Sequence, residues 1–103
     1  MKRTRSMVYN PTHESHELYL YAVNNGNLYR SMTQAVIANL SKKASKGTYD
    51  SEKAVDAWYR IATEAGKMYA KEYCSFGFKF DVTARFTAAV ELEEYYREEI
   101  LEV

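Results

Sequence analysis

The sequence predicts an all-α protein, a small bundle of three to four helices with a flexible basic N-terminal arm. Most segments of the 103-residue chain place apolar residues three and four positions apart, the spacing that gives a helix one apolar face. Turn-forming residues separate these segments at positions 10–12, 24–27, 46–50 and 77. The length suits one domain. We therefore predict a flexible basic arm over 1–10 and a single helical domain over 11–103.

The first helix is expected over about residues 11–24. Asn10 can accept hydrogen bonds from free backbone amides at a helix start, and Pro11 suits the first helical position because its missing N–H is not needed there. Residues 18–23 are apolar throughout, which is equally typical of a strand. The sequence leaves these two alternatives open for that stretch.

The second helix is expected over about residues 28–45, with Asn27 as its N-cap and Gly47 at its end. Regular helical spacing predicts that one side of it faces the core, with Leu28, Met32, Ala35, Val36, Asn39 and Leu40. Three lysines follow in or just beyond the last turn, where cations interact favourably with the helix dipole: Lys42, Lys43 and Lys46.

The third helix, over residues 50–74, has the clearest pattern in the chain. Asp50 fits an N-cap, and Trp58 is the largest side chain of the apolar repeat, so we expect it to be mostly buried. Tyr69 and Tyr73 continue the same repeat toward the end of the helix.

A break then precedes the last helix. Residues 76–80 alternate aromatic with small or polar residues, so they are either extended or helical, and Asp81 fits the N-cap of the helix that follows. Six glutamates are expected on the outside of this last helix: Glu91, Glu93, Glu94, Glu98, Glu99 and Glu102.

Composition favours a folded cytoplasmic protein. Hydrophobic residues make up 47% of the chain and charged residues 27%, unlike disordered proteins. The single cysteine, Cys74, excludes an internal disulfide framework and fits a reducing compartment. No apolar run follows the basic N-terminus or reaches the length of a membrane span, so we expect neither a signal peptide nor a membrane partner.

Charge is unevenly distributed although the formal net charge is zero. Residues 1–46 hold seven basic and two acidic side chains, so the remaining residues carry the opposite excess. Such a separation steers partners by orientation and favours self-association near neutral pH. A homodimer is therefore one predicted assembly.

No residue pattern indicates an enzyme, a cofactor, a metal or a small-molecule substrate. His13, His16 and Glu17 share a helical face, but their spacing is not that of a zinc motif and no further ligand is evident, so we interpret them as solvated residues of a helix start. Cys74 lies near a predicted helix C-terminus, where the dipole disfavours a thiolate. We predict a non-enzymatic protein.

The abundance of tyrosine indicates that the partner is a protein. Ten tyrosines exceed what so small a core accommodates, and tyrosine is enriched at protein interfaces. Those next to core positions are predicted to form a surface that binds another protein or a second copy of this chain: Tyr19, Tyr29, Tyr49, Tyr59 and Tyr95. The sequence is equally consistent with tyrosines that only cover the core with their hydroxyls in water.

Nucleic acid is the alternative partner. Lysines and arginines contact phosphates, and tyrosines can stack on bases. The zero net charge and the glutamates near the C-terminus argue against it. The residues that would bind are Lys2, Arg3, Arg5, Lys42, Lys43 and Lys46.

Residues 25–30, the Asn39-Leu40 pair, and residues 46–50 followed by Ala54 and Trp58 resemble a group of uncharacterised short proteins encoded by phages and other mobile elements. The resemblance spans about residues 17–100, and Asn27 stands where that group more usually has an acidic residue. It implies a small accessory or host-directed protein, such as an inhibitor of a host system. It carries over no catalytic or binding residue.

Overall fold

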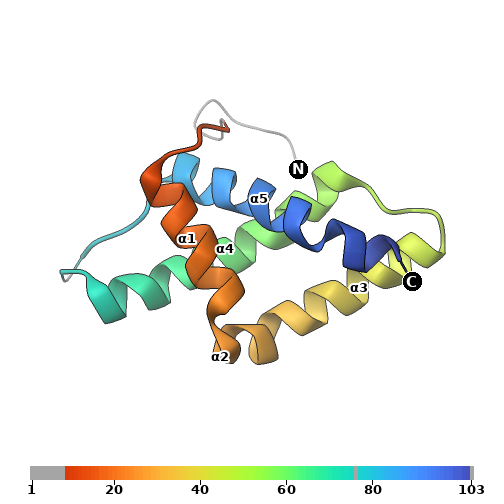
Figure 1. Ribbon diagram of the computed structural model, residues 1–103, viewed down its shortest axis with the longest axis horizontal. Coiled ribbons are helices and arrows are strands. Elements are labelled where there is room, and N and C mark those ends of the chain that lie inside the picture. The colour runs from red at the N-terminus through yellow and green to blue at the C-terminus, as the bar shows by residue number, and fades with distance from the viewer. Residues whose placement is uncertain (1–8, 76, 103) are drawn as a thin grey trace.

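The computed structural model describes residues 9–75 and 77–102, and the fold is all-α (Figure 1). Its elements in chain order are α1 (His13–Asn24), α2 (Gly26–Leu28), the π-helical segment η1 (Tyr29–Thr33), α3 (Gln34–Ser45), α4 (Ser51–Tyr73) and α5 (Val82–Leu101). The helical bundle is confirmed, and residues 18–23 are helix rather than strand. Residues 77–80 connect α4 to α5 and are not helical. Residues 1–8 of the predicted arm lie outside the described residues.

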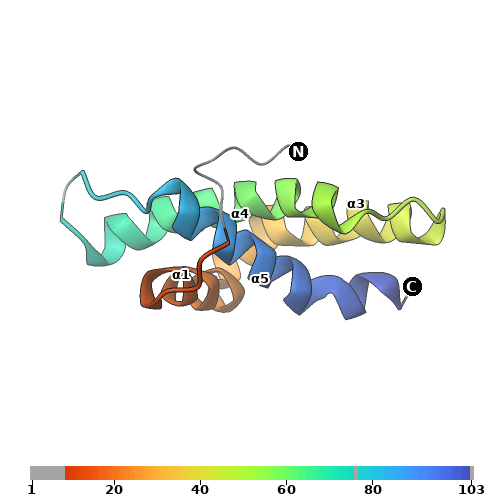
Figure 2. The same ribbon diagram turned by 90° about the horizontal axis from the view of Figure 1, so that it is seen from above.

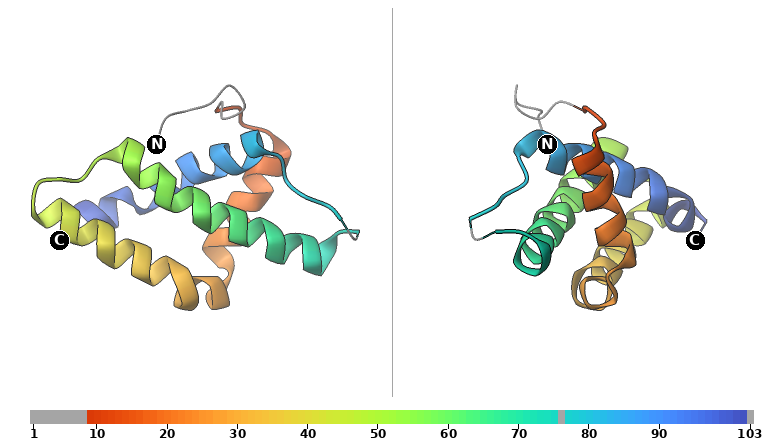
Figure 3. Two further views of the ribbon diagram at one scale, coloured as in Figure 1. Left: turned by 180° about the vertical axis from the view of Figure 1, so that it is seen from behind. Right: turned by 60° about the vertical axis from the view of Figure 1, so that its left-hand side comes forward.

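The helices form two layers. Seen from above, α3 and α4 lie in one layer and α1 and α5 in the other (Figure 2). Seen from behind, α3 and α4 run side by side, and α1 crosses behind α4 (Figure 3). The most extensive packing is between α4 and α5, and α1 packs against both of them. The molecule is accordingly flat, with principal extents of 44 × 32 × 17 Å.

The start of α1 differs from the prediction. Thr12, not Asn10, is the N-cap: Thr12 Oγ1 accepts a hydrogen bond from Ser15 N at 3.1 Å, and Ser15 Oγ accepts one from Thr12 N at 2.9 Å. These two reciprocal hydrogen bonds form a capping box and satisfy the backbone N–H groups of Thr12 and Ser15. The helix therefore begins after Thr12, and Pro11 precedes it. Asn10 instead donates its backbone N–H to Thr87 Oγ1 on α5 at 2.9 Å, which holds the entry to α1 against α5.

The next helical run begins earlier than expected and is irregular. Asn25, not Asn27, caps it, because Asn25 Oδ1 accepts from Leu28 N at 2.8 Å. The run passes through the π turn η1 before it continues as α3. A π turn holds one extra residue, so every later side chain is displaced around the helix by about 100°.

The predicted inner face of this run is therefore shifted by one position after Leu28. Thr33 is buried in place of Met32, which is only partly buried, and both Ala35 and Asn39 are exposed. Leu40 remains in the core with 4% of its surface exposed. The regular spacing used for the prediction was wrong between these residues because it assumed an uninterrupted α-helix.

The remaining helix ends agree with the sequence. Gly47 has φ +74° and follows α3 in a Schellman motif, in which Thr48 N donates to Lys43 O at 2.8 Å. Asp50 caps α4 by accepting from Glu52 N at 2.9 Å. Asp81 caps α5 by accepting from Ala84 N at 2.8 Å. These local signals fix the directions in which α4 and α5 start.

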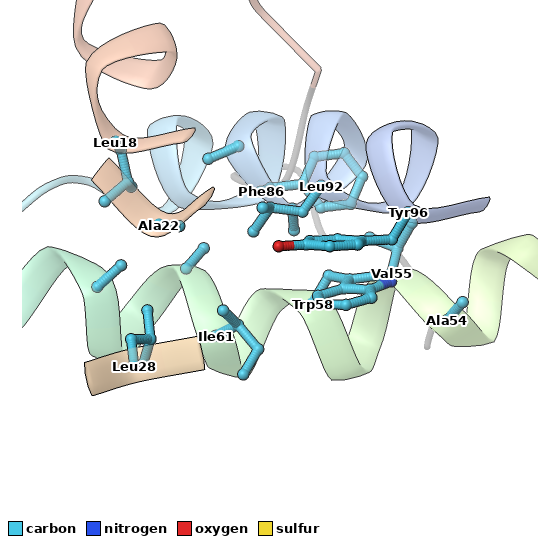
Figure 4. Close-up of a cluster of buried hydrophobic side chains, with 14 of the residues drawn as sticks. Leu18, Ala22, Leu28, Ala54, Val55, Trp58, Ile61, Phe86, Leu92 and Tyr96 are labelled. Carbon is cyan, nitrogen blue, oxygen red and sulfur yellow. The ribbon is translucent and has the colours of Figure 1, made fainter. Parts of the chain in front are cut away.

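The core lies where α1, α4 and α5 meet (Figure 4). Trp58 is fully buried at its centre, as predicted, and its ring packs on Tyr96 of α5. Alanines on both helices, among them Ala62, Ala65 and Ala89, are also fully buried, which allows α4 and α5 to approach closely. Other large apolar side chains of the described residues that are at most 1% exposed are Leu18, Leu28, Ile61, Phe86, Leu92 and Ile100.

Candidate functional site

An aromatic cluster lies where α1 crosses the end of α4. The ring of Tyr21 meets those of Tyr69 and Tyr73 edge to face, with centroids 5.4 Å and 6.3 Å apart, and the Tyr69 and Tyr73 rings are 5.1 Å apart. Tyr73 is 65% exposed, and the neighbouring Leu20 is 38% exposed. We call Leu20, Tyr21, Tyr69 and Tyr73 the α1–α4 aromatic cluster. Together with Glu17 and Asn24 they line an open hollow of about 280 Å³.

Helical geometry explains why these tyrosines gather. Tyr21 lies beside the buried Ala22 on α1, at the edge of the contact with α4. Tyr69 and Tyr73 are four residues apart, so they share one face of α4 at its C-terminal end. The Tyr21 hydroxyl donates to Glu72 Oε1 at 3.3 Å, and burial together with this carboxylate raises the pKa of Tyr21. The Tyr21 hydroxyl thus remains a donor, and its ring is held in place.

Two of the five tyrosines predicted from the sequence lie together on the other side of α1. The rings of Tyr19 and Tyr95 meet edge to face with centroids 5.9 Å apart, and the centroid of the His16 ring lies 5.9 Å from that of Tyr19. Tyr95 is 56% exposed, whereas Tyr19 is partly buried. Burial also raises the pKa of Tyr19.

The other three predicted tyrosines come from separate elements. Tyr29 lies in η1 and packs partly buried against the core. Tyr59 lies on α4 with the Arg85 guanidinium 5.4 Å from its ring centre, and Tyr49 lies in the connection before α4. Among the described residues, none of these three makes a ring contact with Tyr19 or Tyr95. Within that part of the chain, the five predicted residues therefore do not form one cluster.

Glu93 was predicted on the outside of α5, and this is wrong. Its side chain is 2% exposed and accepts hydrogen bonds from Arg97 Nε at 2.8 Å, from Arg97 Nη2, and from the Tyr49 hydroxyl at 2.7 Å. Burial alone would raise the pKa of Glu93, but the bonds from Arg97 and Tyr49 outweigh it, so its pKa lies below the usual value. This network fastens the connection between α3 and α4 to α5.

The histidines face different carboxylates. His13 Nε2 is 3.8 Å from Glu17 Oε1, on α1 itself, whereas His16 Nδ1 is 3.7 Å from Glu91 Oε2, on α5. Cys74 is partly buried just after α4. Within residues 9–75 and 77–102, no three His, Cys, Asp or Glu residues are placed to hold a metal ion.

The lysines of the alternative nucleic-acid site are exposed at the end of α3: Lys42, Lys43 and Lys46. The end of α5, with the exposed Glu98, Glu99 and Glu102, lies at the same end of the molecule (Figures 1 and 2). Its negative charges partly offset the field of the lysines. Lys2, Arg3 and Arg5 lie outside the described residues.

None of the helices in the described ranges has both the length and the apolar character needed to cross a membrane. Comparisons with protein-family models, with curated proteins and with solved structures found no match to this chain. Function is therefore inferred from the surfaces described above.

Proposed function

We propose that this chain is a non-enzymatic binding protein whose partner is another protein, held on an aromatic band that crosses α1. The band joins the α1–α4 aromatic cluster to the Tyr19–Tyr95 pair. Successive residues of a helix point about 100° apart, so Leu20 projects between Tyr19 and Tyr21. Tyr19 contacts Tyr95 of α5, and Tyr21 contacts Tyr73 of α4. Leu20, which is 38% exposed, thus lies between the two ring contacts on the outer side of α1.

One observation supports this proposal above the others: the most exposed rings of the band are already held by neighbouring rings. Tyr73 and Tyr95 are 65% and 56% exposed, and each makes an edge-to-face contact with a partly buried tyrosine of α1. Such rings lose little conformational freedom on binding, which lowers the entropic cost of an interface. Tyrosine also supplies large contact area together with a hydroxyl that can hydrogen-bond.

A host-directed role is part of the proposal. The resemblance of residues 17–100 to short phage and mobile-element proteins supports a partner in a host cell, with inhibition of a host system as the consequence of binding. A second copy of this chain is the other partner that the uneven charge supports. A host protein and a second copy of this chain would both bind to the side chains of the aromatic band.

A photo-crosslinking amino acid placed at Tyr73 or at Tyr95 tests the proposal. We expect one discrete adduct from both positions, and none from Lys53, an exposed residue on α4 outside the band. Mass spectrometry of the adduct separates a host protein from a second copy of the chain. Tyr73→Ala and Tyr95→Ala should then each weaken the complex by about 1–3 kcal/mol without unfolding the protein. Equal labelling from Lys53, or unchanged affinity in both variants, would refute the band as the interface.

Nucleic-acid binding is the second candidate, and one observation favours it. Lys42, Lys43 and Lys46 are exposed together, and none of them forms an ion pair with another described residue. Fluorescence anisotropy of labelled DNA and RNA at low and at physiological salt tests this candidate. Reversing the three charges should lower the affinity for all nucleic-acid sequences. It should also reduce the slope of log affinity against log salt concentration by about one unit for each phosphate that the lysines no longer neutralise. Binding that is insensitive to salt would rule it out.

A further inference from the structure

A second hollow lies between α4, the residues that lead into α5, and the first turn of α5. Its volume is about 190 Å³. Gly66 of α4 and Phe80 both line it, and a Cβ at position 66 would lie only 3.2 Å from Phe80 Cδ2. The glycine therefore lets the Phe80 ring pack directly on the helix, which forms one wall of the pocket.

The apolar part of the pocket is aromatic. The rings of Phe78 and Phe80 meet edge to face with centroids 5.1 Å apart. Phe80 is 5% exposed and belongs to the core, whereas Phe78 is 38% exposed. A flat apolar group entering the pocket would meet a buried ring and a more exposed one in an arrangement that aromatic ligands favour.

The polar part of the pocket is basic. Among the described residues that line it, Lys67, Lys79 and Arg85 carry positive charges and none carries a negative charge. Glu64 reaches Lys67 only at 4.0 Å, with both side chains well exposed, so it neutralises little of this field. Three cations beside an aromatic wall attract an anion with an apolar body.

A buried hydroxyl completes the set. Thr63 lines the pocket, and its Oγ1 is buried with no hydrogen-bond partner among the described residues. Leaving a buried hydroxyl unpaired costs free energy, so a ligand that pairs with it gains stabilisation. A carboxylate oxygen in the pocket would supply a counter-charge for the lysines. Rotation of Thr63 about χ1 would bring its hydroxyl, which has almost no accessible surface in the present rotamer, to that oxygen as a donor.

We propose that this pocket binds a small organic anion, a carboxylate carried on an aromatic or short apolar body. The carboxylate lies among Lys67, Lys79 and Arg85 and accepts a hydrogen bond from Thr63, while the body packs on the phenylalanines. The pocket shares no lining residue with the aromatic band, so this site does not depend on the proposed function. A free carboxylic acid and the C-terminal carboxylate of a peptide that ends in phenylalanine both offer this chemistry.

Titration with phenylacetate, followed by amide chemical shifts of the labelled protein, tests the proposal. We expect saturable shifts confined to residues around 63–67 and 77–85. Benzyl alcohol has a similar ring and no charge, and it should bind at least about tenfold more weakly because it lacks a charge-assisted hydrogen bond. An acetylated Gly-Phe peptide with a free carboxylate, compared with its amide, distinguishes the two sources: tighter binding of the free-acid peptide than of phenylacetate assigns the site to a peptide end.

Three variants locate the interaction. Lys79→Gln should weaken phenylacetate binding about tenfold by removing a charge-assisted contact. Thr63→Val keeps the shape of the side chain, removes only the unpaired hydroxyl, and should weaken binding several-fold while the protein stays folded. Lys53→Gln, on the same helix but away from the pocket, is the control and should change nothing.

Three outcomes would overturn the assignment. The first is the absence of saturable shifts with phenylacetate. The second is equal binding of benzyl alcohol, which would show that no cation takes part. The third is a loss of affinity in the Lys53→Gln control as large as that in Lys79→Gln, since this would reflect overall charge rather than a site.

Discussion

Trp58 on α4 and Tyr96 on α5 form an offset stack of nearly parallel rings at the centre of the molecule, with ring centroids 4.9 Å apart and ring planes 11° apart (Figure 4). Both rings are buried, and burial raises the pKa of Tyr96 to about 12. The indole Nε1 is buried and has no hydrogen-bond partner within residues 9–75 and 77–102. The stack therefore stabilises the α4–α5 contact through its aromatic surface, not through the polar group of Trp58.

Replacing Trp58 should show this directly. Trp58→Ala leaves a large cavity beside Tyr96 and should lower the free energy of unfolding by about 3–5 kcal/mol. Trp58→Phe keeps an aromatic ring for the stack and removes the unpaired N–H, so its cost should be clearly smaller. Urea unfolding followed by circular dichroism measures both, with Lys53→Ala as an exposed control on the same helix. Equal losses in the two Trp58 variants would mean that the stack contributes nothing specific.

Glu93 should make stability fall in acid. Its folded pKa lies below the unfolded value because Arg97 and Tyr49 hydrogen-bond to the carboxylate. Its contribution is therefore complete above the unfolded pKa, about 4.3, and is lost as the pH falls through the folded pKa. Glu93→Gln should lower the free energy of unfolding at neutral pH by about 1–3 kcal/mol and reduce the loss of stability on acidification. Urea unfolding across the acid range measures this, and an unchanged pH profile would exclude Glu93 as its cause.

Glu91 should change the pH dependence of stability in the opposite direction. Burial raises its pKa above the unfolded value, and the nearby His16 offsets only part of this. Its contribution is therefore present below the unfolded pKa and is lost as the pH rises through the raised folded pKa. Glu91→Gln should leave the protein at least as stable at neutral pH and remove this loss between acid and neutral pH. Urea unfolding across the acid range also measures the effect of Glu91→Gln, with Glu93→Gln as the matched variant two residues away. If Glu91→Gln destabilised the protein at neutral pH as much as Glu93→Gln does, the difference between the two sites would be contradicted.

The capping box at the start of α1 is the fourth prediction. Thr12→Ala removes the side chain that accepts from Ser15 N and should lower the free energy of unfolding by about 1 kcal/mol. Asn10→Ala should have almost no effect, because Asn10 bonds to Thr87 through its backbone N–H, which alanine retains. Thermal or urea unfolding of the two variants side by side decides between Thr12 and the cap that the sequence suggested. A larger effect from Asn10 would contradict the structure.

Local signals in the sequence predicted much of this fold, because helix ends depend on neighbouring residues. Asp50, Asp81 and Gly47 act at the positions expected from their chemistry. Glu93 could not be placed in this way. Its partner Tyr49 is 44 residues away, so the burial of this carboxylate depends on how α5 packs against the connection before α4.

The sequence predicted the aromatic character of the candidate interface but not which residues form it. Tyrosine abundance indicated an aromatic interface, but Tyr73 was not among the predicted interface residues because it continues the apolar repeat of α4. In the structure Tyr73 is 65% exposed, and its ring meets that of Tyr21 on α1. The basic pocket depends likewise on Phe80 folding back onto Gly66, a contact between residues 14 positions apart that no spacing rule supplies.

The π turn η1 supplies the last prediction, because it sets which side of α3 faces the core. Deleting Ser31, an exposed residue inside the turn, should remove the extra residue and restore regular helix, with the side chains of α3 pointing in their present directions. Leu40 should therefore stay in the core. Deleting Ala38, an exposed residue of α3 beyond the turn, should instead rotate Leu40 by about 100° out of the core, at a cost of about 2–3 kcal/mol in the free energy of unfolding. Ser31→Ala is the matched control: it keeps the residue count and loses only a 3.4 Å bond to Leu28 O, so its effect should be small. If urea unfolding gave the two deletions the same stability, the π turn would not be where the extra residue that sets the direction of Leu40 is held.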